Sequence, residues 1–230
     1  MVKAEVKTNQ KKEGTTFSDL YLISYNGIQT IGWSYLLYQL AGHYLTSSER
    51  SLYDTVKCTV AVFQNAAVLE VVHAATGLVR SDPIITAFQV ASRVLVVCGV
   101  LMATASARES IGLSLALLAW CVTEIIRYSL YTLTIVGSVP HFLKYLRYTL
   151  FIGLYPLGIT GELLCLYAAQ REVGDGKLYS ILMPNKYNFI FNYQHVLIFI
   201  MLLYIPLFPQ LYLHMFSQRK KALGKTKKAN

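Results

Sequence analysis

The chain has 230 residues, of which 54% are hydrophobic and only 14% are charged, and its mean hydropathy is +0.43. This composition excludes an ordinary water-soluble domain and favours a protein that crosses a membrane several times. The net charge of +9 does not indicate a nucleic-acid partner, because the basic residues gather mainly at the two ends of the chain, outside the apolar segments.

Residues 1 to 19 are polar and carry lysines, and we expect them to form a cytosolic tail without a cleavable secretory signal. Residues 20 to 215 are expected to form one transmembrane domain, because several apolar segments approach the roughly 20 residues that a spanning helix needs. Residues 216 to 230 should form a basic cytosolic tail. The sequence therefore predicts an all-α, polytopic membrane protein with six transmembrane helices in one bundle: Leu20 to Leu40, Val56 to Val79, Ile85 to Ala105, Ile111 to Leu133, Phe142 to Ala169, and Phe189 to Met215, the last broken by Pro206 and Pro209.

The distribution of basic residues predicts the orientation of these helices. With the N-terminus in the cytosol, thirteen lysines and arginines fall on the cytosolic side and six on the opposite side. The positive-inside rule therefore favours two cytosolic termini. Lys227 and Lys228 stand fourth and third from the end, which resembles the dilysine signal that retrieves membrane proteins to the endoplasmic reticulum; an anchor on anionic lipid is the alternative.

The segment from Leu154 to Glu162 contains the strongest candidate for chemistry. Tyr155 and Glu162 are seven residues apart, which is about 700° of helical rotation and a rise of roughly 10.5 Å, so they share one face of a helix. Pro156 predicts a bend in this helix. An ionisable residue at membrane depth usually marks a pathway or a site, and a tyrosine with a glutamate can act as an acid and base pair.

Four more ionisable residues lie within the apolar segments: Glu70, Arg93, Glu124 and Arg127. Glu124 and Arg127 are three positions apart, which allows an ion pair on one helix face, and a structural or a site role fits equally well. No cysteine shows metal-ligand spacing, so the sequence predicts no metal site. Dehydration of a 3-hydroxyacyl thioester needs a pair such as Tyr155 and Glu162, because one group must take the α-proton while another protonates the departing hydroxyl.

The pattern Tyr-Pro-x-Gly-x-x-x-Glu at residues 155 to 162 resembles the very-long-chain (3R)-3-hydroxyacyl-CoA dehydratase family. The similarity covers nearly the whole chain, from the first expected helix to the last. It extends over Ala67-Val-Leu-Glu70, Gly77-Leu-Val-Arg80, Glu124-Ile-Ile-Arg127-Tyr128, Tyr145-Leu-Arg147-Tyr148 and Met183-Pro184-Asn185.

This resemblance implies a multi-pass enzyme of the endoplasmic reticulum that needs no cofactor and performs the third step of fatty-acid elongation. The implied substrate is a (3R)-3-hydroxyacyl-CoA, the product is a trans-2-enoyl-CoA, and the implied partners are the condensing enzyme, the ketoacyl-CoA reductase and the enoyl-CoA reductase. The resemblance implies that Tyr155 and Glu162 are the catalytic pair. Which of the two is the base and which the acid stays open, because a buried glutamic acid can also act beside a tyrosinate.

Six further residues receive supporting roles as hypotheses. Gly158 is interpreted as structural, and Arg147 as a contact for the CoA phosphates at the cytosolic mouth. The remaining four are expected to line or brace the cavity: Glu70, Arg93, Glu124 and Arg127.

Three alternatives compete with the dehydratase hypothesis. Cys165 and Arg171 match the Cys-x5-Arg spacing of tyrosine phosphatases, but that chemistry needs a loop of free backbone donors, and the intervening residues continue an apolar helix. A catalytically inactive membrane scaffold or regulator of the elongation complex would retain the buried charges only to brace the bundle. A transporter would also place polar residues at depth, yet the chain shows no internal repeat.

Overall fold

The computed structural model describes residues 16–46, 49–181, 183–184, 186 and 188–224. Most of the described residues are helical, and the one β-bridge among them joins Ile181 to Phe191. Residues 1–15 of the tail expected at residues 1–19, and the dilysine ending at Lys227 and Lys228, lie outside the described residues. The end of this expected tail was wrong, because residues 17–19 already belong to the first helix, Phe17–Leu45. The all-α prediction is confirmed.

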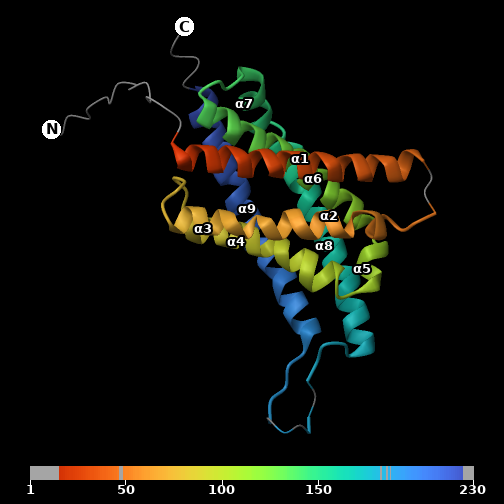
Figure 1. Ribbon diagram of the computed structural model, residues 1–230. Coiled ribbons are helices and arrows are strands. Elements are labelled where there is room, and N and C mark those ends of the chain that lie inside the picture. Colours follow the sequence, from red (N-terminus) through yellow and green to blue (C-terminus); the bar gives the residue numbers. More distant parts are fainter. Residues whose placement is uncertain (1–15, 47–48, 182, 185, 187, 225–230) are drawn as a thin grey trace, which may run out of the picture.

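Nine α-helices and one π-helix follow one another along the described chain (Figure 1). They are α1 (Phe17–Leu45), α2 (Leu52–Ala66), α3 (Val68–Ala75), α4 (Pro83–Val94), the π-helix η1 (Leu95–Leu101), α5 (Ala105–Glu109), α6 (Ile111–Val136), α7 (His141–Arg147), α8 (Phe151–Gly176) and α9 (Tyr193–Gly224).

Five helical stretches of the described chain are long and apolar enough to cross a membrane. The first expected helix, α1, is not among them, although it has 29 residues, because polar side chains interrupt its apolar sequence. The structure therefore supports a multi-pass membrane protein. The five stretches are Leu52–Ala75, Pro83–Leu101, Ile111–Val136, Phe151–Gly176 and Tyr193–Lys220.

Several expected helix limits were wrong. The helix expected from Val56 to Val79 is two helices, α2 and α3, which end at Ala75, and the helix expected from Ile85 to Ala105 is α4 followed by η1, which ends at Leu101. The single helix expected from Phe142 to Ala169 is two helices, α7 and α8, and α8 continues to Gly176. The last helix extends past Met215 to Gly224, so the first residues of the expected basic tail are helical. Hydropathy marks where an apolar segment ends, but glutamine, glutamate, lysine and arginine are good helix formers and prolong the helix beyond that point. Pro206 and Pro209 lie inside one continuous α9 and do not divide it.

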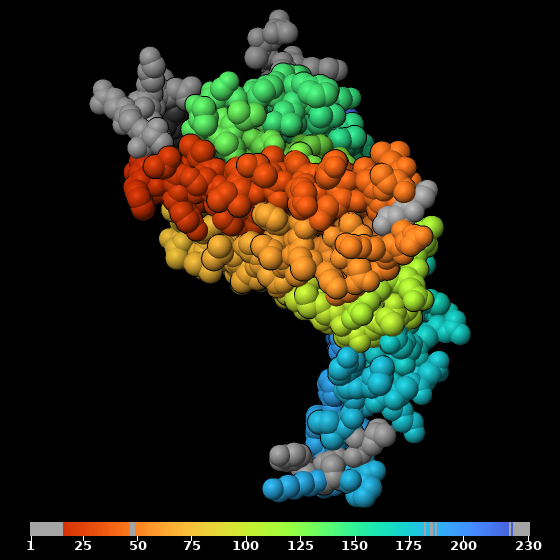
Figure 2. Space-filling view, turned by 45° about the vertical axis from the view of Figure 1, so that its right-hand side comes forward, coloured from red at the N-terminus to blue at the C-terminus, as the bar shows by residue number. Residues whose placement is uncertain are grey.

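The first residues of α1 and the last residues of α9 lie on the same side of the helical bundle. Figures 1 and 2 show α1 beside α2 and α3 as adjacent layers. The end of α8 and the beginning of α9 project beyond these layers. In Figure 1 the beginning of α1, the turn between α3 and α4, α7 and the end of α9 all lie toward the upper left. The beginning of α2, α5 and the connection from α8 to α9 lie toward the right and below.

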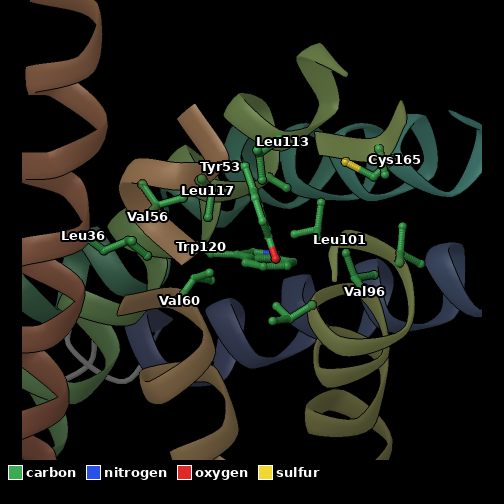
Figure 3. Close-up of a cluster of buried hydrophobic side chains, with 14 of the residues drawn as sticks. Leu36, Tyr53, Val56, Val60, Val96, Leu101, Leu113, Leu117, Trp120 and Cys165 are labelled. Carbon is green, nitrogen blue, oxygen red and sulfur yellow. The ribbon is translucent and has the colours of Figure 1, made fainter. Parts of the chain in front are cut away.

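Helix α6 is the central element of the bundle. In the most apolar 18 residues of α6, 56% of the residues are buried. The corresponding part of each of the other four apolar stretches is 33% buried or less. Figure 3 shows Trp120 of α6 in the middle of a cluster of buried side chains that includes Tyr53, Val60 and Leu101 from the surrounding helices. Because lipid tails are as apolar as these side chains, close packing and not exclusion of water holds such a bundle together.

Helices α6 and α8 approach most closely at two glycines. A Cβ atom added to Gly161 would lie 2.4 Å from the backbone nitrogen of Ala116 and 2.7 Å from the carbonyl oxygen of Gly112. Backbone atoms cannot move aside as a flexible side chain can, so only glycine permits this crossing. The same crossing fixes the face that α8 turns toward its neighbours.

We predict that Gly161→Ala lowers the free energy of unfolding by about 1–3 kcal/mol, the usual cost of overpacking. The loss can be measured by thermal unfolding of the detergent-purified protein. The matched control is Gly153→Ala on the same helix, where an added Cβ meets nothing within 4 Å. That variant should stay within about 1 kcal/mol of the parent protein, because alanine is the better helix former. Equal stabilities of the two variants would contradict a close contact between the helices.

Candidate functional site

Tyr155 and Glu162 share one face of α8, as their seven-residue spacing predicts, and both contact α9. The Tyr155 ring stacks on Phe208 and on Tyr212, with ring centroids 5.5 and 5.8 Å apart. The Glu162 carboxylate accepts a hydrogen bond of 2.7 Å from the hydroxyl of Tyr204, which lies one helical turn before Phe208. One face of α9 therefore contacts both members of the candidate pair.

Helix α9 also supplies a hydrogen bond to the backbone carbonyl that Pro156 leaves without its usual donor. Proline has no N–H, so it cannot donate to the carbonyl of Ile152 four residues earlier, and such an unpaired carbonyl is costly in an apolar environment. The hydroxyl of Tyr212 donates to this carbonyl at 3.0 Å. Helix α8 consequently runs through Pro156 without interruption, and the predicted bend at this position stays a prediction.

The carboxylate of Glu162 is buried, with 7% of the residue exposed, and both of its oxygens accept hydrogen bonds. The indole Nε1 of Trp120 donates to Oε1 at 2.8 Å, and the hydroxyl of Tyr204 donates to Oε2 at 2.7 Å. Three helices, α6, α8 and α9, therefore meet at this one side chain.

The Tyr155 hydroxyl is in a different situation. Its ring is half-buried against α9, but the hydroxyl forms no hydrogen bond with any residue that the structure describes. Tyr155 lies two helical turns before Glu162 on the same face of α8, and both side chains contact the same face of α9. A fixed carboxylate thus lies near a phenol whose hydroxyl is free to meet a ligand.

Four of the predicted supporting residues form a single ion-pair network. Arg127 of α6 makes two hydrogen bonds, of 2.6 and 2.8 Å, with Glu70 of α3, and its Nη2 lies 2.5 Å from Glu124. Glu124 also pairs with Arg93 of α4. The hydroxyl of Tyr128 donates to Glu70. The local Glu124–Arg127 pair that the sequence predicts is confirmed, whereas the partners from α3 and α4 were not predicted.

The network reaches the candidate pair through Trp120. The guanidinium of Arg93 lies 5.7 Å from the centre of the Trp120 ring, which is within the range of a cation–π contact. Because the other end of this indole donates to Glu162, polar contacts run without a gap from Glu70 to Glu162.

The remaining two predicted residues lie apart from these contacts. Gly158 is buried, and a Cβ added to it would lie 3.3 Å from the Cβ of Ala119, which fits the predicted structural role. Arg147 is half-buried in α7 and forms no ion pair with a described residue. No cluster of three or more metal-binding side chains occurs within the described part of the chain.

The sequence analysis missed Trp120 and Tyr204. One signal for Trp120 is that an indole inside an apolar span needs an acceptor for its N–H. A signal for Tyr204 is the four-residue spacing of Tyr204, Phe208, Tyr212 and Phe216, which places four aromatic rings on one helix face.

Comparisons with known proteins agree on one family. Residues 64–225 match the sequence model of the protein tyrosine phosphatase-like protein family, PTPLA. The very-long-chain (3R)-3-hydroxyacyl-CoA dehydratase 2 of Mus musculus is 46% identical over 219 residues, which cover 94% of this chain and 86% of the relative. The chain belongs to the PTPLA family.

Two further members come from distant organisms. The very-long-chain (3R)-3-hydroxyacyl-CoA dehydratase hpo-8 of Caenorhabditis elegans is 48% identical over 89% of this chain and 94% of its own length. The corresponding dehydratase PASTICCINO 2 of Arabidopsis thaliana is 35% identical over 91% of this chain and 95% of its own length. No solved structure matches the chain significantly.

The phosphatase-like name of the family finds no counterpart in the geometry of Cys165. This cysteine is fully buried, and both it and Arg171 lie inside the continuous helix α8. Backbone N–H groups within a helix are already bonded to carbonyls one turn earlier, so they cannot surround a phosphate. The prediction that the residues between Cys165 and Arg171 continue a helix is confirmed.

Proposed function

We propose that the protein is a very-long-chain (3R)-3-hydroxyacyl-CoA dehydratase whose catalytic residues are Tyr155 and Glu162. The observation that carries this proposal is the pairing of a fixed carboxylate with a phenol whose hydroxyl has no described partner. The names of relatives that are 35 to 48% identical over most of the chain supply the substrate class. The reaction is an elimination of water and needs neither a metal nor a redox cofactor.

In the proposed mechanism Glu162 is the base and Tyr155 is the acid. Glu162 takes a proton from C2 of the acyl chain, the C–H electron pair forms the C2–C3 double bond, and the C3–O bond breaks. Tyr155 gives its proton to the departing hydroxyl, which leaves as water. Return of the proton from Glu162 to the Tyr155 phenolate restores the enzyme. The free hydroxyl of Tyr155 favours this assignment, because an acid must be able to reach the leaving group.

The same proposal assigns secondary roles. Arg147 lies in α7, just before α8, and its guanidinium, which forms no ion pair with a described residue, suits the phosphates of CoA. Gly158 allows α6 and α8 to pack closely beside the pair. The network of Glu70, Arg127, Glu124 and Arg93 braces the three helices that carry it.

We further propose that residues 20–215 form a six-helix membrane domain, with α1 as the sixth span. Helix α1 buries Asn26 and Gln29, at 5% and 1% exposed, while Ile28 and Ile31 are 61% and 71% exposed. Polar residues turned inward and apolar residues turned outward suit a helix in contact with lipid. An even number of spans agrees with the start of α1 and the end of α9 lying on the same side of the bundle (Figure 1). The distribution of basic residues favours a cytosolic location for this side.

The proposed cellular setting is the endoplasmic reticulum membrane. There the protein would act beside a condensing enzyme, a ketoacyl-CoA reductase and an enoyl-CoA reductase, because its substrate and product are intermediates of a four-step elongation cycle. The proposed dilysine ending suits retention in that membrane.

The test of the proposed activity is direct. Detergent-purified protein should convert a long-chain (3R)-3-hydroxyacyl-CoA to the trans-2-enoyl-CoA, measured as loss of one water by mass spectrometry. The (3S) isomer is the matched control substrate and should react far more slowly. The buried Cys165 leads us to expect no release of phosphate from a phosphotyrosine peptide. A folded protein that leaves the (3R) substrate unchanged would refute the dehydratase.

A further inference from the structure

Glu162 is held by two residues to which the proposed reaction assigns no role. Trp120 is 42 residues before it and Tyr204 is 42 residues after it, and they reach it from α6 and α9. We propose that Tyr204 and Trp120 are positioning residues that hold the Glu162 carboxylate in the orientation from which it takes the C2 proton. This inference rests on the proposed dehydratase activity.

The hydrogen-bonding capacity of the two partners defines the role of each oxygen. An indole N–H can only donate, so Oε1 of Glu162 must be an acceptor. The Tyr204 hydroxyl donates to Oε2 and has no other hydrogen-bond partner among the residues that the structure describes, so Glu162 receives one donor on each oxygen. Two donors from two different helices define the plane of the carboxylate, which a single hydrogen bond cannot do.

Fixing this side chain matters because a free glutamate is flexible. Holding a long polar side chain in one rotamer costs conformational entropy, and leaving its charge unpaired in an apolar region costs more. Trp120 and Tyr204 offset both costs before the substrate arrives. A base that is already oriented needs no rearrangement when the proton is transferred.

Both positioning residues are themselves held in place. Trp120 is 2% exposed within the buried cluster of Figure 3, and the guanidinium of Arg93 covers its ring. Tyr204 shares a face of α9 with Phe208, which stacks on Tyr155. Helix α9 therefore positions Glu162 through Tyr204 and Tyr155 through Phe208, so one helix sets the distance between the proposed base and acid.

The main test is Tyr204→Phe, which removes one hydroxyl and keeps the ring. The matched control is Tyr193→Phe on the same helix, because the Tyr193 hydroxyl also donates across helices, to the carbonyl of Gly99 at 2.8 Å, but not to Glu162. We expect Tyr204→Phe to lower kcat by about tenfold to a hundredfold with little change in KM, as the loss of a hydrogen bond to a charged group predicts. Tyr193→Phe should keep kcat within about threefold of the parent value, since its hydroxyl serves a neutral carbonyl.

A second readout separates positioning from general damage. With a substrate deuterated at C2, a slower proton abstraction should raise the isotope effect on kcat above the parent value. An isotope effect is a ratio, so a variant with fewer folded molecules but an intact site would keep the parent value. Trp120→Phe removes the indole N–H that donates to Glu162 and should also raise the isotope effect. This second variant keeps the test informative if Tyr204→Phe fails to fold.

Three results would overturn the inference: kcat of Tyr204→Phe within twofold of the parent, a reduced kcat with an unchanged isotope effect, or an equal loss in Tyr193→Phe. These results differ from a failure of the proposed function. An inactive parent protein would refute the dehydratase itself. An active parent, an inactive Glu162→Gln and an unaffected Tyr204→Phe would refute only the positioning role.

Discussion

The Glu162→Gln variant should lower kcat/KM for dehydration by about 10²- to 10⁴-fold, the usual worth of a general acid or base, while the protein still folds. Glutamine keeps the length of the side chain. Its amide oxygen can still accept the Trp120 N–H, and the Tyr204 hydroxyl can turn to accept from the amide NH₂. The contacts around residue 162 can therefore survive, but an amide cannot take the C2 proton.

The Tyr155→Phe variant should lose activity to a similar extent for the complementary reason. Phenylalanine keeps the stacking on Phe208 and Tyr212 and removes only the hydroxyl that would protonate the leaving group. Activity of both variants is to be measured on the monodisperse fraction after gel filtration. Retention of more than about a tenth of the parent kcat/KM would be too much for loss of a general acid or base and would contradict the assigned pair.

The matched control for these variants is Glu172→Gln, on the same helix as the pair. Glu172 also accepts two hydrogen bonds, from the backbone nitrogens of Ala105 and Ser106 at 3.1 and 2.7 Å, and it holds the start of α5. It makes no contact with Tyr155 or Glu162. Its replacement should lower stability slightly and leave kcat/KM near the parent value, so a specific loss at Glu162 cannot be attributed to charge removal from α8 in general.

The parts of the site that could be predicted from the sequence are those set by the helical period. Seven residues are almost two turns, so Tyr155 and Glu162 share a face whatever surrounds them, and three residues bring Glu124 within reach of Arg127. The partners of these residues are tertiary. Glu70 and Arg93 come from α3 and α4, and no local pattern indicates which charge meets which across the bundle.

The same limit explains why Trp120 and Tyr204 were missed. The chain contains 17 tyrosines, most of them near expected membrane segments, so a tyrosine within an apolar helix carries little information by itself. Its role becomes visible only when the crossing of α8 and α9 places its hydroxyl 2.7 Å from Glu162. The helix ends were misjudged for a different reason, because hydropathy follows the membrane and helix formation follows backbone propensity.

The Glu124→Gln variant should produce the largest loss of stability, about 3–5 kcal/mol, because it leaves a buried charge without compensation. Glu124 is 2% exposed and is the shared partner of Arg93 and Arg127. In the parent protein two carboxylates balance two guanidinium groups. Without the Glu124 charge, Glu70 alone must balance both arginines. Thermal unfolding in detergent should show the loss.

An exposed ion pair provides the control for this prediction. The Nζ atom of Lys57 lies 2.9 Å from Oδ1 of Asp54, and the side chains of Asp54 and Lys57 are 55% and 48% exposed. Asp54→Asn should lower the unfolding temperature much less than Glu124→Gln does, because exposed ion pairs contribute little to stability. If Asp54→Asn and Glu124→Gln unfold at the same temperature, the buried network does not stabilise the bundle.

A double variant separates uncompensated charge from lost attraction. Adding Arg93→Met to Glu124→Gln removes the excess positive charge and leaves Arg127 paired with Glu70. We therefore expect the double variant to be more stable than Glu124→Gln alone, although it lacks one more ion-pairing group. If the two losses simply added, the network would act as a set of independent contacts. The double variant also lacks the guanidinium that covers the Trp120 ring. If its stability recovers but its kcat stays low, Arg93 contributes to activity through its contact with Trp120, which donates to Glu162.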